Sequence, residues 1–126
     1  MPRILVIDDD DEMRLMLRMM LEKEGYDVSD TFDGDVGVRL FNQDPFDLVI
    51  TDILMPRKEG IATIVELRRD NPDLKVIAIS GGSMQPNTGL SCGNVLKLAQ
   101  AVGASCVLAK PFDRDEFLGA VQKLLP

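Results

Sequence analysis

The sequence contains no histidine, and this absence narrows the chemistry that the chain can perform. Histidine is the usual general base near neutral pH and the commonest metal ligand. Without it the chain has no imidazole base, no histidine-ligated zinc site and no phosphohistidine of its own. Its chemistry must therefore rest on carboxylates, lysine, hydroxyl groups or cysteine thiols.

Cysteines and long apolar runs are also scarce. Cys92 and Cys106 are the only cysteines, and they are too far apart for a C-x-x-C motif. The apolar run that begins at Ile4 stops at four consecutive aspartates, so it is too short for a signal peptide, and no run approaches the length of a membrane span. We therefore expect a cytoplasmic protein with reduced thiols and no membrane insertion.

The other bulk properties are those of one ordinary globular domain. The 126 residues suffice for a single hydrophobic core, so we assign residues 1–126 to one domain. The net charge is −7, and no dense cluster of lysine and arginine is present. Direct binding to nucleic acid or to anionic membranes is disfavoured, because both need a positive surface.

Short apolar segments alternate with segments in which apolar residues recur at helical spacing. The expected strands are residues 4–7, a weaker one beginning at residue 28, and residues 46–51, 76–79 and 106–109. The expected helices cover residues 13–21, 36–41, 61–69, 95–102 and 113–125. This alternation predicts an α/β fold, a doubly wound, parallel five-stranded sheet with helices on both faces.

Polar residues follow four of the expected strands. Asp8 and Asp9 follow the first strand, Asp52 the third, Ser80 the fourth and Lys110 the fifth. In sheets of this kind, ligands bind at the carboxyl ends of the strands. We therefore expect these five residues to converge on one edge of the molecule.

Together these side chains provide what phosphoryl transfer requires. Three carboxylates in one place repel one another unless a cation lies among them. Oxygen ligands without histidine or cysteine favour a hard ion such as Mg²⁺. A carboxylate can act as nucleophile, Lys110 can neutralise charge, and Ser80 can donate a hydrogen bond to a phosphoryl oxygen.

The order of these residues resembles the receiver domain of two-component response regulators. The resemblance rests on four motifs in register along the whole chain: residues 4–10, residues 47–56 with Gly60 after them, Ser80, and Lys110-Pro111-Phe112. It implies a flavodoxin-like (βα)5 fold with strand order 2-1-3-4-5.

By this resemblance, Asp52 is phosphorylated by a phosphohistidine on a sensor histidine kinase or a histidine phosphotransfer protein. A downstream protein partner, which the sequence does not identify, would then read the phosphorylated state. The residues implied for Mg²⁺ are Asp8, Asp9, Asp52 and the backbone carbonyl of Leu54, and those implied for the phosphoryl group are Ser80 and Lys110.

Three features depart from the family. Val107 stands three residues before Lys110, where receivers usually carry an aromatic residue, so we expect a switch without the usual aromatic movement. The loop of residues 81–93 is longer than usual, and it is interpreted as a tolerated surface loop, with a lid or docking role as the alternative. Leu54 and Gly82 occupy the two positions that, in this family, usually tune the attack of water on the phosphorylated aspartate. Neither side chain can orient a water molecule, so we predict slow self-dephosphorylation.

The first helix carries two further expectations. Its acidic start, from Asp10 to Glu12, is interpreted as favourable charge at a helix amino terminus. Leu15 and Met19 are expected to be exposed, either as ordinary surface residues or as a docking surface for the phosphodonor's helical bundle. Most methionines of this helix are expected to fill the core, on the face formed by Met16, Leu17, Met20 and Leu21.

Two other functions compete with a phosphorylated signalling switch. A degenerate receiver would bind its partner without phosphorylation, and Val107 gives this reading some support. A phosphohydrolase would use Asp8 as nucleophile in the pattern Asp8-x-Asp10. However, position 12 is glutamate rather than the usual threonine or valine, and the chain holds no cap domain.

Overall fold

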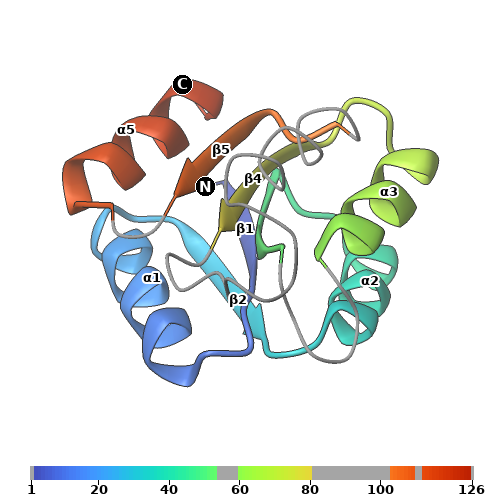
Figure 1. Cartoon of the computed structure of the whole chain (residues 1–126), viewed down its shortest axis with the longest axis horizontal. Helices are drawn as coiled ribbons and strands as arrows, with labels where there is room; N and C mark the ends of the chain where they lie inside the picture. Colours follow the sequence, from blue (N-terminus) through green and yellow to red (C-terminus); the bar gives the residue numbers. More distant parts are fainter. Residues whose placement is uncertain (1, 54–59, 81–102, 110–111, 126) are drawn as a thin grey trace, which may run out of the picture.

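The computed structural model describes residues 2–53, 60–80, 103–109 and 112–125. Figure 1 shows the elements in chain order. They are β1 (Arg3–Ile7), α1 (Asp11–Lys23), β2 (Asp27–Thr31), α2 (Gly34–Gln43), β3 (Leu48–Asp52), α3 (Gly60–Asp70), β4 (Lys75–Ser80), β5 (Cys106–Ala109) and α5 (Arg114–Leu124). The expected helix of residues 95–102 and the loop of residues 81–93 lie outside the described residues.

The five strands form one parallel sheet in the order β2-β1-β3-β4-β5. The predicted α/β class and the strand order implied by the family resemblance are therefore confirmed. Because every strand runs the same way, the carboxyl ends of β1, β3, β4 and β5 share one edge. The register places Asp52 of β3 opposite Ile79 of β4, and Ser80 opposite Ala109 of β5.

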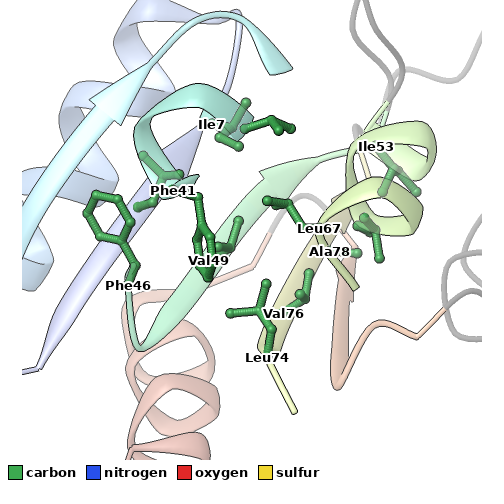
Figure 2. Packing of buried hydrophobic residues seen from close by; sticks show 12 residues of the cluster. Ile7, Phe41, Phe46, Val49, Ile53, Leu67, Leu74, Val76 and Ala78 are labelled. Atoms are coloured by element: carbon green, nitrogen blue, oxygen red, sulfur yellow. The ribbon is translucent and has the colours of Figure 1, made fainter. Parts of the chain in front are cut away.

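Helices cover both faces of the sheet (Figure 1). Side chains alternate between the faces along each strand, so Ile4 and Val6 pack under α1 and α5, whereas Leu5 and Ile7 pack under α2 and α3. Figure 2 shows the second of these cores, in which side chains of α2 and α3 lie against the central strands. Two apolar layers thus hold the strand ends in fixed positions.

The third strand begins later than the sequence pattern predicts. Asp47 accepts a hydrogen bond from the backbone N–H of Arg3 through its carboxylate and donates its own N–H to the carbonyl of Arg3. These bonds hold the chain just before the strand, so the regular pairing of β3 starts at Leu48. Phe46 lies outside the strand but is buried, and the centroid of its ring is 6.2 Å from that of the Phe41 ring.

The acidic start of α1 lies at its amino terminus, as the sequence interpretation expects, and both ends of the helix are capped. Asp10 is the N-cap residue, and its carboxylate accepts hydrogen bonds from the N–H groups of Glu12 and Met13. Gly25 follows the helix with φ of +91°, a conformation that glycine adopts without steric cost.

Two arginines tie α1 to β2 through Asp30. Arg14 and Arg18 both form ion pairs with Asp30, and Arg18 also pairs with Glu22. Hydrogen bonds to Asp30 and then to Glu22 raise the pKa of the Arg18 guanidinium above its ordinary value. The Arg18 guanidinium therefore stays positively charged at any physiological pH.

The expectation that most methionines of α1 fill the core is wrong. Met16 and Met19 are 42% and 61% exposed, and Met13 and Met20 are only partly buried. The buried side of the helix is narrow and centres on Leu17 and Leu21. Since successive residues are about 100° apart around a helix, Met16 turns away from the sheet. Leu15, at 58% exposure, and Met19 are exposed as expected.

Gly37 lies in the middle of α2, where glycine weakens a helix by roughly 1 kcal/mol relative to alanine. A Cβ atom at this position would lie 2.5 Å from Cδ1 of Ile7 and 3.0 Å from its Cγ1. The missing side chain therefore lets α2 approach β1 closely.

Both described ends of the chain lie at the amino-terminal edge of the sheet. The carbonyl of Pro2 accepts a hydrogen bond from the N–H of Asp27, the first residue of β2. Lys75, the first residue of β4, donates from Nζ to the carbonyl of Leu124 at the end of α5 (2.6 Å). Among the described residues, no helix has both the length and the apolar composition needed to cross a membrane.

Candidate functional site

The carboxyl edge of the sheet gathers acidic side chains from β1 and β3. Asp8 directly follows β1, and Asp52 is the last residue of β3. Asp8 lies two residues after Val6, and Asp52 lies two residues after Ile50; Val6 and Ile50 both belong to the core under α1 and α5. Because side chains two residues apart in a strand point to the same face of the sheet, both carboxylates lie on the face that α1 covers.

Asp8, Asp9 and Asp52 form one cluster, as predicted. One carboxylate oxygen from each lies within 4.8 Å of those of the other two. Asp8 is fully buried, Asp52 is 6% exposed, and Asp9 is exposed. The cluster therefore has a buried floor and one side open to solvent.

Backbone contacts hold the two buried aspartates in place. The N–H of Asp10 donates to Oδ1 of Asp8 (2.9 Å), and Arg14 donates from Nη1 to the Asp8 carbonyl (2.8 Å). The Thr51 hydroxyl donates to the carbonyl of Asp52 (3.0 Å). The supporting contacts of Asp10 and Arg14 were not predicted from the sequence, because they depend on the path of the turn after β1.

The donor set of this cluster fits a small, hard divalent cation. It contains carboxylate oxygens only, which suits Mg²⁺ better than metals that prefer nitrogen or sulfur. The three carboxylate oxygens lie within 4.8 Å of one another, and two oxygens that share one Mg²⁺ ion at about 2.1 Å are at most about 4.2 Å apart. The carboxylates are therefore near enough to hold one ion directly or through a water molecule.

Three other predicted site residues are described only in part or not at all. The backbone of Ser80 ends β4, beside Ala109 of β5. Lys110 follows Ala109 but lies outside the described residues, as does Leu54. Their roles remain predictions. Val107, which stands at the usual aromatic position, is half-buried against the core under α2 and α3.

We expect Mg²⁺ to stabilise the folded chain through this cluster. At a free concentration one hundred times Kd, binding to the folded state alone raises the free energy of unfolding by about 2.7 kcal/mol. Asp9→Asn should weaken Mg²⁺ binding at least tenfold, which lowers this gain by about 1.3 kcal/mol or more. Urea unfolding with and without Mg²⁺ measures both values.

The matched control for Asp9→Asn is Asp73→Asn. Asp73 is also exposed and loses the same charge, but it lies just before β4, at the opposite edge of the sheet. Equal Mg²⁺ stabilisation of the wild type and the Asp9→Asn variant would contradict a metal site at this cluster.

The sequence matches the family described as "Response regulator receiver domain" over residues 4–122. The response regulator receiver protein CpdR of Brucella abortus is 33% identical over 125 residues, which cover 99% of this chain and 98% of CpdR. The transcriptional regulatory protein CpxR of Klebsiella pneumoniae is also 33% identical over 125 residues, but these cover only 50% of CpxR. The chain thus spans nearly all of CpdR and about half of CpxR.

The fold has close counterparts among solved structures. The crystal structure of a response regulator receiver domain protein from Clostridium thermocellum superposes with a TM-score of 0.87 at 27% identity. The superposition covers 99% of this chain and 94% of that protein. The sequence and the fold therefore point to the same family.

Proposed function

Because the chain belongs to the response regulator receiver domain family, we propose that it accepts a phosphoryl group on Asp52 in the presence of Mg²⁺. Receiver domains are signalling modules rather than turnover enzymes. The single observation that carries the proposal is the position of Asp52, which ends a buried central strand with a carboxylate oxygen within 4.8 Å of Asp8 and Asp9.

In the proposed reaction, an Asp52 carboxylate oxygen attacks the phosphorus atom of a phosphohistidine on the partner. The new O–P bond forms as the N–P bond breaks, and the departing imidazole takes up a proton. Mg²⁺, when bound, supplies charge neutralisation between the carboxylates and the phosphoryl oxygens. Asp8 and Asp9 would hold the ion, while Lys110 and Ser80 would contact the phosphoryl group.

The proposed phosphodonor is a sensor histidine kinase or a histidine phosphotransfer protein, and its proposed docking surface is on α1. Leu15, Met16 and Met19, called here the α1 surface, are all exposed apolar side chains. They project from the helix whose amino terminus follows Asp8 and Asp9 directly. Apolar residues at spacings of three and four suit packing against another helix.

Intact mass after incubation with phosphoramidate tests the proposal without a partner protein. We expect one phosphate adduct per chain when Mg²⁺ is present and none when it is chelated. Absence of any adduct on folded protein, with transfer from histidine kinases also absent, would favour a phosphorylation-independent binding module. Repeated release of phosphate from a chromogenic ester, lost on Asp8→Asn but retained on Asp52→Asn, would favour a phosphohydrolase.

A further inference from the structure

The α1 surface borders a hollow of about 450 Å³ between α1 and the start of α5. Side chains from both helices line it: Glu12, Leu15, Met16, Met19, Met20, Lys23 and Arg114. Two of the three side chains of the α1 surface are methionines that face solvent. The hollow is therefore lined by exposed methionine side chains, where leucine would provide a similar apolar area.

A thioether differs from a leucine side chain in one chemical respect that matters at a surface. Methionine is oxidised reversibly to a sulfoxide, which is polar and disrupts apolar interfaces. Met13 and Met20 stand on the same helix but are half-buried against the core under α1 and α5. The helix thus carries two exposed methionines beside two half-buried ones.

We propose that Met16 and Met19 form a reversible oxidation site for peroxides. In the reaction the sulfur atom attacks one oxygen of hydrogen peroxide, the O–O bond breaks, and the products are a sulfoxide and water; an organic hydroperoxide would release an alcohol instead of water. Sulfur is oxidised and peroxide is reduced. The return step uses a thiol reductant through a methionine sulfoxide reductase, which turns two thiols into a disulfide as the sulfoxide oxygen leaves as water. The two sulfoxides make the α1 surface polar. The consequence for signalling, weaker docking of the phosphodonor, rests on the proposed function.

The first test maps oxidation by residue after brief treatment with hydrogen peroxide. Trypsin cleaves at Arg14, Arg18 and Lys23, which places Met13 and Met16 in different peptides. Met19 and Met20 share a peptide, and fragmentation distinguishes them. We expect Met16 and Met19 to oxidise at least about threefold faster than Met13 and Met20. Equal rates at all four positions would overturn the proposal.

The second test measures the apolar character of the surface with the dye ANS, which reports exposed hydrophobic area. Peroxide should lower the fluorescence of bound dye by roughly half in the wild type, and a methionine sulfoxide reductase should restore it. The double variant Met16→Leu/Met19→Leu should keep its dye signal after peroxide, whereas Met16→Gln/Met19→Gln should start with the lowered signal. Met20→Leu is the matched control and should respond like the wild type.

Loss of structure and failure of the proposed function are distinguished by two further measurements. Circular dichroism and urea unfolding confirm that each oxidised sample remains folded. The oxidised wild type should still form the Mg²⁺-dependent phosphate adduct with phosphoramidate, because the small donor needs no docking surface. Absence of the adduct before oxidation counts against the proposed function alone. An unchanged dye signal in oxidised, folded protein counts against the oxidation site alone.

Discussion

We expect the Asp52→Asn variant to lose the phosphate adduct completely while it keeps its fold. The amide of asparagine is not a nucleophile toward phosphorus, and no other carboxylate of the cluster stands at the end of β3. Asp52 is nearly buried at the centre of the sheet, between β1 and β4. Asparagine has almost the same shape, so the packing around it should persist. Intact mass with phosphoramidate and Mg²⁺ measures the adduct.

The control for this loss is the Asp73→Asn variant, which removes the same charge at the opposite edge of the sheet and should form the adduct like the wild type. Asp9→Asn should form the adduct more slowly, and higher Mg²⁺ should recover part of the rate. An adduct that persists on Asp52→Asn would place the acceptor at another residue. Peptide mapping would then identify it.

The second large effect concerns stability. We expect Phe117→Ala to lower the free energy of unfolding by about 3–5 kcal/mol, because it removes a large buried ring and leaves a cavity. Phe117 lies on the buried side of α5 and is fully buried, and its ring stacks on that of Phe112 with the ring centroids 5.8 Å apart. A loss of this size is a large fraction of the roughly 5–15 kcal/mol that stabilises a domain. Urea unfolding measures it.

Val65→Ala provides the comparison for Phe117→Ala. Val65 is 46% exposed on α3, so its truncation should change the stability by less than about 0.5 kcal/mol. A loss below about 1 kcal/mol for Phe117→Ala, with an unchanged dependence on urea, would show that α5 does not pack on the sheet as described.

The fold was predictable because its signals are local and repeated. Runs such as Ile4–Ile7 mark strands buried on both faces, and apolar residues at helical spacing mark the helices between them. The strand order came from the resemblance to receiver domains, since periodicity alone does not order strands.

The close approach of α2 to β1 at Gly37 was not predictable, because it depends on the distance between α2 and Ile7. The exposure of Met16 was not predicted, because the buried side of α1 is narrower than the apolar pattern of its sequence suggests. That side consists of Leu17 and Leu21.

The shared edge of the acidic residues was predictable from the parallel sheet, and their closeness from the strand order that the resemblance implies. Once the strands are parallel, Asp8 and Asp52 must end at the same edge, whatever the details of the loops. The contacts that hold Asp8 were not predictable, because they involve a backbone N–H at Asp10 and a long side chain from Arg14. The hydroxyl of Ser80 and the positions of Leu54 and Lys110 stay predictions, since they lie beyond the described side chains.

The placement of Pro2 and Leu124 beside the starts of β2 and β4 has a practical consequence for sensor design. Fluorescent proteins fused at Pro2 and Leu125 would both leave from the edge of the sheet opposite Asp52. They would leave the acidic cluster open to a donor. A single-chain energy-transfer reporter built this way would test for structural change in the domain without covering the acidic cluster.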